Sequence, residues 1–542
     1  SVQGKGASSG PITDIDGNYS IEAPANGTIV FRFVGLRTVE QAVNNRNVIN
    51  VTMESESKEL EEVMVVAYAT AKKYSFTGAA STMKAGEIEK LQTSSVSRVL
   101  EGTVSGVQAS ASSGQPGTDA EIRIRGIGSI NASSAPLYVV DGVPFDGSVN
   151  SINPDDIASM TVLKDAASAA LYGSRGANGV IIITTKQGQQ DSKATVKVKA
   201  TLGGSSRAVR DYDRVNTNQY FELYWEALRN QYAKSSDYTP ATAAAQASKD
   251  LVTKLMGGGP NPYGTQYPQP VGTDGKLAAG ARPLWNSDWS DAMEQQALRT
   301  ELNLSVSGGG KANQYFFSAG YLNDKGIALE SGYQRFNLRS NVTSEMTSWL
   351  KGSINLSFAH SMQNYPVSSD SKTSNVITAG RTMPGFYPIY EMNTDGSYKL
   401  DDNGDRIYDF GSYRPSGSMA NWNLPATLPL DKSERMKDEF SGRTYLEATI
   451  IEGLKFKTSF DLINYNTLDY TNPKIGPALE NGGGSSRLNS RTFSWTWNNI
   501  ASYDKTIGDH HFNVLAGMEA YSYRYDELTA SRTKMAQPDM PE

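Results

Sequence analysis

Residues 121–144, EIRIRGIGSINASSAPLYVVDGVP, and residues 160–188, MTVLKDAASAALYGSRGANGVIIITTKQG, decide the fold of this chain. Runs that are rich in β-branched and aromatic residues predict three strands, at 121–125, 137–140 and 180–185. The Ala-rich segment 165–172 favours a helix between the second and the third of these strands. Together the two stretches predict a small α+β unit.

Residues that tolerate positive φ mark the turns of this unit. Asp141 and Gly142 follow the second strand, and Gly173, Gly176 and Gly179 lie between the helix and the last strand. On the first strand arginines alternate with isoleucines, so one face is apolar and the other is cationic. Such a face is unusual on a core strand of a soluble domain, and it suits a globule that sits inside a polar lumen.

Both stretches closely resemble the plug domain of TonB-dependent outer-membrane transporters, within the SusC/RagA-like branch that imports nutrients. The resemblance implies a plug at residues 77–188, no cofactor, and binding or coupling roles for the residues of the plug motif. These residues are Arg123, Arg125, Gly126, Asp141, Gly142, Lys164, Asp165, Tyr172, Gly173, Arg175 and Gly176. A dinucleotide-binding loop at 126–131 is not expected, because Asn131 takes the place of the third glycine and no clear helix follows.

The first part of the plug shows weaker patterns. Apolar residues recur at roughly helical spacing between Gly86 and Gly102, which predicts a helix there. Residues 104–108 resemble a short strand of the family's plug. Neither segment adds a candidate catalytic residue.

Composition excludes several classes of function. The chain has 542 residues, enough for two or three domains, and no cysteine, which excludes disulfides, zinc ribbons and thiol catalysis. A net charge of −6 gives no basic surface for nucleic acid. No apolar run of about 18 residues predicts a transmembrane helix, whereas membrane-crossing strands show only alternation. His360, His510 and His511 lie in strand-like segments with no nucleophile elbow elsewhere, so we predict no enzyme and no catalytic residue.

Residues 1–54 resemble the carboxypeptidase-regulatory-like β-sandwich that precedes the plug in many family members, truncated at its start. We expect a turn at 14–17 and strands near 19–21, at 28–36 and at 48–53. The Asp-x-Asp-Gly-Asn pattern of the turn also occurs in calcium loops, but Ala25 occupies the twelfth position, where such a loop needs an acidic ligand. We therefore predict a hairpin turn and no metal. No signal peptide is visible at Ser1, so we expect the native start to precede it.

Residues 55–76 form a linker into the plug. An apolar run stands there between acidic residues and two lysines, and it consists of Val63, Met64, Val65, Val66, Ala67 and Tyr68. In the family this position holds the TonB box, an extended segment that pairs with a strand of the inner-membrane energy transducer, TonB, by β-augmentation. A linker strand packed on the plug is the alternative interpretation.

Residues 189–542 alternate apolar and polar side chains over long segments. The pattern predicts about nine strands, near 196–202, 302–306, 315, 336–342, 350–358, 445, 454–462, 493–497 and 512. Each would turn an apolar face to lipid and a polar face to a lumen, in a mainly β chain that also carries the β-sandwich and the α+β plug. Plugged outer-membrane barrels have about 22 strands, so we expect this chain to be the first half of a longer polypeptide.

Long segments between these strands carry the expected specificity. Residues 207–297 include a helix predicted at 218–232 and a Gly/Pro-rich loop, and a second long loop covers 364–430. The candidate ligand-contacting residues are Tyr263, Tyr267, Trp285 and Trp289, since rigid aromatics beside amides suit sugars and peptides equally. A well-packed external loop is the alternative for each of them. Residues 401–405, another calcium-like pattern, are explained as well by a glycine-containing hairpin.

The resemblance implies TonB-dependent import of an oligosaccharide or a peptide across the outer membrane of a Gram-negative bacterium. It also implies three further partners besides the cargo: TonB with its inner-membrane complex, a SusD-like surface lipoprotein, and outer-membrane lipid. Two alternatives are a siderophore or vitamin receptor and a soluble β-rich binding or adhesion protein. The plug motif and the long alternating strands argue against the second.

Overall fold

The structure, a computed structural model, forms two compact units, Ser1–Gly78 and Ala79–Glu542. It describes residues 2–4, 10–11, 13–14, 17–33, 36–53, 63–66, 69–72, 80–111, 114–128, 133–165, 169–209, 211–366, 375–415, 420–430, 432–472, 484–508 and 510–533. Across these ranges, no helix combines the length and the hydrophobicity needed to cross a membrane.

The first unit contains a three-stranded antiparallel sheet in the order β1-β2-β3. Its strands are β1 (Val2–Gly4), β2 (Thr28–Phe33) and β3 (Leu36–Ala42). The predicted turn is confirmed, because the Asp14 carboxylate accepts a hydrogen bond from the Asn18 amide at 2.7 Å and Gly17 has a φ of 86°. Asp16 lies outside the described residues.

Two strands predicted in this unit were wrong. Residues 19–21 and 48–53 are not strands, although their alternating side chains pack on a small core that includes Ile29 and Phe31. The Tyr19 hydroxyl donates to the Ile49 carbonyl at 2.7 Å, so these segments are joined through a side chain and not through a ladder. The alternating pattern arises because every second side chain is buried, and an extended segment can bury its side chains in this way without pairing with another strand.

The plug is built on a five-stranded sheet in the order β10-β9-β12-β11-β6, with a separate β7–β8 hairpin. The strands are β6 (Ala80–Lys84), β7 (Val107–Ser110), β8 (Glu121–Ile124), β9 (Leu137–Val140), β10 (Val143–Pro144), β11 (Ile157–Leu163) and β12 (Val180–Thr185). All three strands predicted from the deciding stretches are confirmed. The apolar core lies under β11 and β12 and includes Ile157, Val162, Ile181 and Ile183.

The long helix predicted at 86–102 was wrong. The segment forms α1 (Ala85–Lys90) and the short 3-10 helix η2 (Ser97–Leu100), with Gln92 at a φ of 50° between them. The break is explained by Ser95, whose hydroxyl donates to the Asn150 side chain at 2.6 Å and so favours a turn over helix. The Ala-rich segment gives a 3-10 helix, η5 (Ala170–Gly176), and residues 166–168 lie outside the described ranges.

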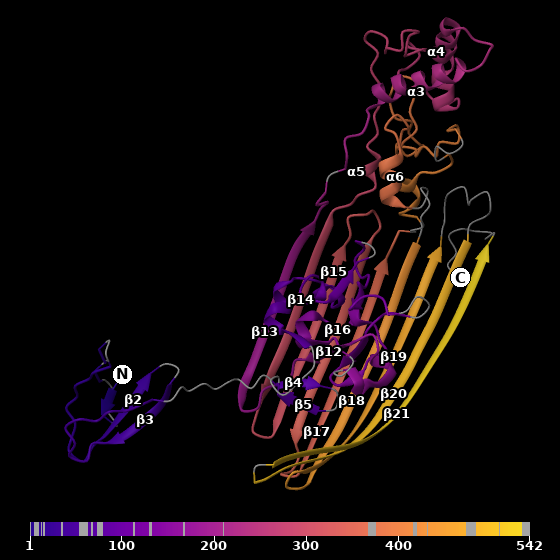
Figure 1. Cartoon of the computed structure of the whole chain (residues 1–542). Helices are drawn as coiled ribbons and strands as arrows, with labels where there is room; N and C mark the ends of the chain where they lie inside the picture. Colours follow the sequence, from indigo (N-terminus) through magenta and orange to yellow (C-terminus); the bar gives the residue numbers. More distant parts are fainter. Residues whose placement is uncertain are drawn as a thin grey trace. The chain divides into compact units, whose positions relative to one another are not determined.

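The large sheet has nine antiparallel strands in chain order, β13 to β21, and the plug lies against one face of it (Figure 1). The strands are β13 (Ser192–Ser205), β14 (Ala297–Gly309), β15 (Asn313–Lys325), β16 (Gly332–Glu345), β17 (Leu350–Asn364), β18 (Lys432–Ile451), β19 (Leu454–Asn472), β20 (Gly484–Ile507) and β21 (His510–Thr533). All nine predicted strands are confirmed. They have 13 to 24 residues, far more than the 5 or 6 that are usual in soluble proteins.

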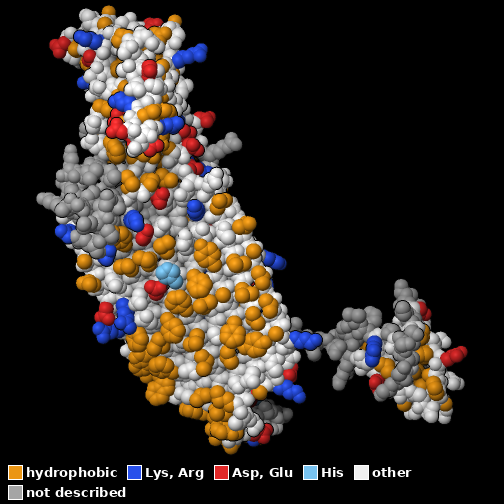
Figure 2. Space-filling model, turned by 180° about the vertical axis from the view of Figure 1, so that it is seen from behind, with side chains coloured by type: hydrophobic (Ala, Val, Ile, Leu, Met, Phe, Trp, Pro, Cys, Tyr) orange, Lys and Arg blue, Asp and Glu red, His pale blue; other side chains and the backbone are white. Residues whose placement is uncertain are grey.

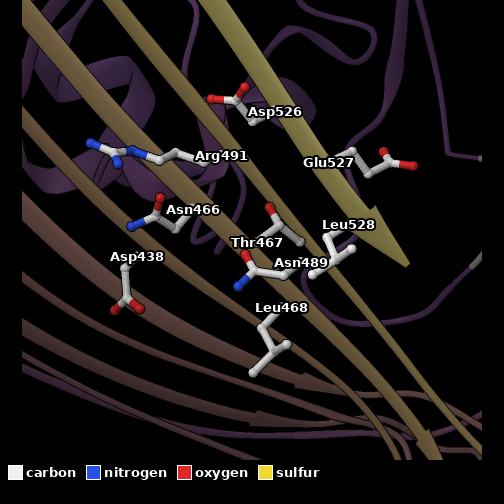
Figure 3. A pocket seen from close by; sticks show the side chains of 9 residues that line it. All are labelled: Asp438, Asn466, Thr467, Leu468, Asn489, Arg491, Asp526, Glu527 and Leu528. Atoms are coloured by element: carbon white, nitrogen blue, oxygen red, sulfur yellow. The ribbon is translucent and has the colours of Figure 1, made fainter. Parts of the chain in front are cut away.

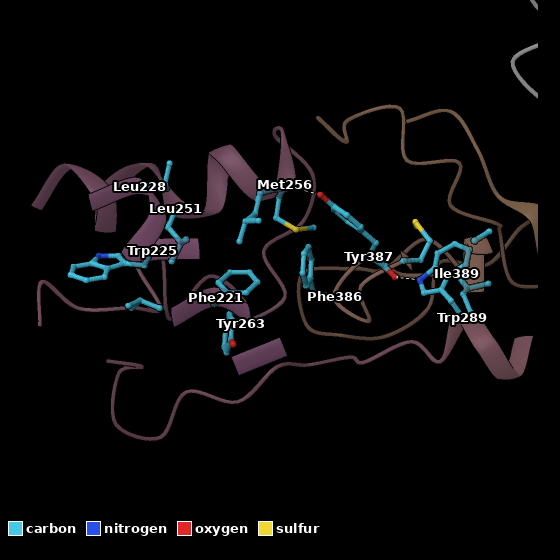
Figure 4. Close-up of a cluster of buried hydrophobic side chains, with 14 of the residues drawn as sticks. Phe221, Trp225, Leu228, Leu251, Met256, Tyr263, Trp289, Phe386, Tyr387 and Ile389 are labelled. Carbon is cyan, nitrogen blue, oxygen red and sulfur yellow. Dashed lines mark hydrogen bonds between the residues drawn. The ribbon is translucent and has the colours of Figure 1, made fainter. Parts of the chain in front are cut away.

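The two longest connections between these strands form one helical body, the loop module, which comprises the described residues 211–296, 375–415 and 420–430. Its helices are α3 (Thr217–Tyr232), α4 (Pro240–Met256), α5 (Trp289–Ala292), α6 (Val376–Thr382) and α7 (Leu424–Thr427). The predicted helix at 218–232 is confirmed as α3. Capping by Asn216 and Thr239 fixes the starts of α3 and α4, and aromatic rings from both connections share one buried core (Figure 4).

Candidate functional site

The large sheet is polar on the face that contacts the plug and apolar on the other. On β16 and β20 the inward side chains are buried and polar: Arg335, Asn337, Arg339, Asn341, Thr343, Thr492, Ser494, Thr496 and Asn498. Their neighbours along the strands, such as Phe336, Leu338 and Trp497, are exposed. Figure 2 shows hydrophobic side chains spread over this outward face. The arrangement is the reverse of a soluble protein's, in which polar side chains face solvent.

Asp141 of the plug is the centre of one contact with the sheet. Its carboxylate accepts hydrogen bonds from the Arg339 guanidinium at 2.7 Å and from the Asn355 amide at 2.8 Å, and it also accepts from the backbone N–H of Thr185 at 2.8 Å. The Asp141 and Arg339 side chains are 11% and 8% exposed. Asp141 and Gly142 have φ of 49° and 89°, so the predicted turn aims this carboxylate at the sheet.

A second contact is made by the short 3-10 helix η4 (Pro154–Asp156). The Asp155 carboxylate pairs with the Lys199 ammonium at 2.8 Å and accepts from the Asn303 amide at 2.5 Å. Asn303 in turn accepts from the Asn153 side chain at 2.7 Å. Burial raises the pKa of the adjacent Asp156 and outweighs the opposing effect of the Arg339 charge.

Glu89 of α1 forms the third contact. Its carboxylate lies 2.6 Å from the Lys186 ammonium of the plug and 3.1 Å from the Lys197 ammonium of β13. Burial alone would raise the pKa of Glu89, but the hydrogen bonds from the two lysines outweigh it and hold that pKa below its usual value.

Other side chains of the sheet, Arg335 and Glu439 among them, hold backbone groups of the plug. Arg335, only 1% exposed, donates to the carbonyls of Ser94, Asn150 and Ile152 at 3.2, 2.8 and 3.3 Å. The guanidinium therefore binds three turns of the plug through their peptide groups, a contact that a lysine could not match in geometry.

Glu439 of β18 reaches the loop before the 3-10 helix η3 (Val149–Ser151). Its carboxylate accepts from the Ser148 amide at 2.8 Å and from the Ser151 hydroxyl at 2.6 Å. A Cβ on Gly147 would lie 2.5 Å from the same carboxylate, so this close approach needs glycine.

Residues of the predicted plug motif divide between the interface and the interior of the plug. Besides Asp141, Arg175 reaches the sheet, where it lies 4.7 Å from the ring centre of Tyr521 while pairing with Asp146 at 3.3 Å. The others have contacts within the plug itself. Arg123 pairs with Glu121, the Arg125 backbone N–H donates to the Gly106 carbonyl, the Lys164 ammonium donates to Ser81, and the Asp165 carbonyl accepts from the Ala169 backbone N–H. Tyr172 is buried, Gly176 packs on Ala169, and Gly126 and Gly173 adopt positive φ.

The sequence alone did not single out the side chains of the sheet that bind the plug. These include Lys197, Lys199, Asn303, Arg335, Arg339, Asn355, Glu439 and Tyr521. A usable signal was present, since charged and amide residues occupy every second position of several strands. Nothing in that pattern, however, says which of them meets which group of the plug.

The predicted TonB box lies in the first unit. Val63–Val66 forms strand β4, which pairs with β5 (Ala69–Lys72) in an antiparallel hairpin with Val63 opposite Lys72. Ala67 and Tyr68 lie outside the described residues. The extended conformation that was expected is thus confirmed for 63–66, and the role as TonB box stays a prediction.

Three of the four candidate ligand-contacting residues are buried in the loop module. Tyr263, Trp285 and Trp289 are 0, 8 and 2% exposed. The Tyr263 hydroxyl donates to the Asn218 side chain at 2.8 Å. The indole N–H groups of Trp285 and Trp289 donate to the carbonyls of Phe386 and Tyr387 at 2.9 and 2.8 Å. They therefore pack the module, which is the alternative that the sequence left open. Tyr267 is half-buried, and its hydroxyl donates to the Ala279 carbonyl at 3.4 Å.

The structure thus combines two features. A small α+β domain is held by polar contacts, and the long strands that hold it have an apolar outer face. These features define the class of plugged, membrane-spanning β-proteins. Family comparisons agree, because residues 72–180 match the TonB-dependent receptor plug domain and residues 1–65 match the CarboxypepD_reg-like domain. Over nearly its whole length the chain is similar to SusC-like TonB-dependent receptors.

Among its relatives, TonB-dependent receptor P3 of Formosa agariphila is 31% identical over 529 residues, which cover 96% of this chain and 46% of the relative. TonB-dependent receptor SusC of Bacteroides thetaiotaomicron is 28% identical, with coverages of 95 and 48%. The RagAB peptide importer in its open-open state gives a TM-score of 0.68 at 25% identity, over 87% of this chain and 50% of the importer chain. The chain thus spans about half the length of these relatives, which are receptors and transporters and not enzymes.

Proposed function

We propose that the full-length protein imports a nutrient, an oligosaccharide or a peptide, across the outer membrane of a Gram-negative bacterium at the expense of energy delivered by TonB. The observation that carries the proposal is the polar inward face of the large sheet, closed by a plug that it holds through hydrogen bonds and ion pairs. An apolar outer face on strands of 13 to 24 residues supports a place in the membrane. The protein would be the transporter subunit of a SusCD-like complex, with a SusD-like lipoprotein as its partner.

The chemistry of the interface suits a plug that must move. Asp141, Asp155 and Glu89 bind the sheet through charged groups that water can also solvate, so the cost of separation is offset when water fills the lumen. An apolar interface of the same size would have no such compensation. The polar face thus serves both as the seat of the plug and as the wall of a wet path for cargo.

The coupling step is assigned to the segment 63–68. A transducer strand could add to the free edge of β4 by β-augmentation, with main-chain hydrogen bonds supplying the affinity. The chain then continues from β5 to β6, an edge strand of the plug sheet whose partner among the described residues is β11. Tension on the segment 63–68 would therefore reach the plug through one of the two edge strands of its sheet.

The cargo class stays open between glycan and peptide. RagAB is a peptide importer, and 87% of this chain is similar to it. This similarity supports a peptide as cargo. The similarity to SusC is comparable in extent. Native mass spectrometry of the complex, extracted gently from outer membranes, would name both the co-purifying lipoprotein and the cargo.

The test of coupling uses the full-length protein in cells. Val65→Pro removes a backbone N–H and the strand conformation from β4, so uptake should be abolished while cargo binding by purified protein is unchanged. Val65→Ile is the matched control and keeps uptake. Normal uptake by the proline variant would refute the assignment of the TonB box.

A further inference from the structure

Three tyrosines of β21, Tyr521, Tyr523 and Tyr525, occupy alternate positions of the strand. They lie directly opposite three residues of β20 that are buried on the inward face of the large sheet, namely Thr496, Ser494 and Thr492. Residues directly opposite each other in an antiparallel pair point to the same side of the sheet. The three rings, which we call the tyrosine ladder, therefore face the side of the plug and not the lipid.

The tyrosine ladder begins at the plug. The Tyr521 hydroxyl donates to the Asp146 carboxylate at 2.9 Å, and the Arg175 guanidinium, which pairs with the same carboxylate, lies over the ring of Tyr521. Tyr523 and Tyr525 follow along the strand, and each is 50% exposed. A molecule that moves along the ladder toward the plug therefore arrives at a ring that the plug itself contacts.

The spacing of the rings matches that of an extended peptide. Side chains on one face of a strand repeat every two residues, about 6.7 Å, so the three rings span about 13 Å along β21. An extended peptide places the side chains of one of its own faces at the same repeat, and three of them can each meet one ring. The repeat of a glycan is set by its glycosidic linkages and has no such relation to a strand.

The tyrosine ladder offers ring faces more than hydrogen-bonding groups. The hydroxyls of Tyr521 and Tyr525 already donate to Asp146 and Glu527. The hydroxyl residues opposite the ladder on β20 are 2 to 6% exposed, so they do not reach a bound molecule. A sugar needs several polar groups that converge on its hydroxyls, whereas apolar and aromatic side chains need only the ring faces.

The end of the ladder away from the plug is acidic. Glu527 is the next inward residue after Tyr525, and it also lines a groove of about 530 Å³ on β18 to β21 (Figure 3). The other charged residues of that groove belong to the outward face, and they are Asp438, Arg491 and Asp526. Among the described residues no lysine or arginine pairs with Glu527, whose carboxylate accepts from the Tyr525 hydroxyl. A carboxylate in this position suits an ammonium group, which peptides carry and neutral glycans lack.

We propose that the tyrosine ladder binds peptide cargo in an extended conformation. An ammonium group of the peptide lies at Glu527, alternate side chains lie on the three rings, and the leading end meets Tyr521 and Arg175. The inference rests on the proposed function and narrows its cargo to peptides. Tyr521 then belongs both to the path of the cargo and to the contact that holds the plug against β21.

The experiment measures binding to the full-length protein, purified with its associated chains in mild detergent and freed of endogenous cargo. Native mass spectrometry compares three probes: a tryptic digest of casein, the same digest with its amines acetylated, and maltohexaose. Wild type should bind the untreated digest more tightly than either of the other probes. Glu527→Gln should bind the untreated digest no more tightly than wild type binds the acetylated one.

The rings are tested at Tyr523, whose hydroxyl is not needed for the proposed contact. Tyr523→Ala should bind the untreated digest about tenfold more weakly, the loss expected for one aromatic contact. Tyr523→Phe keeps the ring and should bind like wild type. Met518→Ala is the matched control, because Met518 is 50% exposed on the outward face of the same strand, and it should also bind like wild type. Heat-modifiable migration in gels verifies that each variant is folded.

Each other outcome overturns the inference. Unchanged affinity in Tyr523→Ala would show that the ladder does not touch the cargo, and equal affinity for the two digests would remove the ammonium contact. Maltohexaose that binds more tightly than the digest, and loses affinity in Tyr523→Ala, reassigns the ladder to a glycan. Cells in which the full-length protein takes up neither kind of cargo would refute the proposed function, whereas uptake with unaltered peptide affinity in Tyr523→Ala refutes only this site.

Discussion

The plug interface and the loop module are both buried, but they are built from opposite chemistry. The interface joins Asp141 to Arg339 and Asp155 to Lys199 through charged groups, whereas the loop module packs Phe221, Trp289 and Phe386 in an apolar core. Separation of the first exposes groups that water can solvate, and separation of the second exposes apolar surface. The polar interface therefore suits a plug that moves, and the apolar core suits a loop module that keeps its shape.

The largest loss of stability is expected from a substitution in the apolar core of the loop module. Trp289→Ala removes a ring that is 2% exposed, together with the hydrogen bond from its indole N–H to the Tyr387 carbonyl. The local free energy of opening should fall by about 3–5 kcal/mol, as for other buried aromatics. Hydrogen exchange of α3, α4 and α6 should accelerate while exchange in the plug is unchanged. Tyr212→Ala, at a site that is 96% exposed, is the control and should change nothing. Equal exchange in both variants would contradict a shared core.

The polar interface is tested by removing one member of its most buried pair. Arg339→Met leaves the Asp141 carboxylate buried with an unpaired charge, so the plug should lose about 3–5 kcal/mol of stabilisation against the sheet. Exchange of the β9–β10 turn reports the change. The double variant Arg339→Met with Asp141→Asn should recover part of the loss, because no isolated charge remains.

A control for this pair exists on the plug surface. Arg123 and Glu121 lie 2.6 Å apart but are 35 and 60% exposed, so Arg123→Met should cost no more than about 1 kcal/mol. If the two arginine variants behaved alike, burial would not be what distinguishes the interface.

The comparison also explains how much the sequence could predict. The nine strands of the large sheet were predictable, because a sheet with one apolar and one polar face requires apolar and polar residues to alternate along each strand. Strand β11 was missed, since most residues of Ile157–Leu163 are buried on both faces and leave no alternation. Tyr263, Trp285 and Trp289 were predicted to contact ligand because they are aromatic residues in long loops. Their residue types could not show that they are buried inside the loop module.

The pairs across the plug interface lie beyond what sequence patterns encode. Arg339 and Asp141 are 198 positions apart, and either could have met several partners on an alternating polar face. The choice depends on where the whole plug sits, which is set by the sum of all the contacts. The Asp141–Gly142 turn, by contrast, depends on local geometry, and its prediction is confirmed.

A smaller effect is expected where the plug approaches the sheet most closely. Gly147→Ala would place a Cβ 2.5 Å from the Glu439 carboxylate, which must then give up its bonds to Ser148 and Ser151. Such overpacking costs about 1–3 kcal/mol. Thermal unfolding in detergent measures it. Gly114→Ala is the matched control, since a Cβ there would meet nothing within 4 Å. Identical midpoints for the two variants would show that the loop can withdraw from the sheet at no cost.

The smallest effect depends on pH and concerns Glu89. The folded pKa of this group lies below its ordinary value of 4.5, so its stabilisation is fully present above that value and is lost as the pH falls through the folded pKa. The side chain is 26% exposed, and screening limits the contribution to about 1 kcal/mol or less. Glu89→Gln should therefore be less stable than wild type at pH 7, and the difference should shrink steadily as the pH falls below 4.5. Glu452→Gln, in a turn between strands, corrects for the loss of one negative charge. A difference that widened toward acid would mean that Glu89 is held in its neutral form. In that case its ion pair with Lys197 would not be what holds α1 to the sheet.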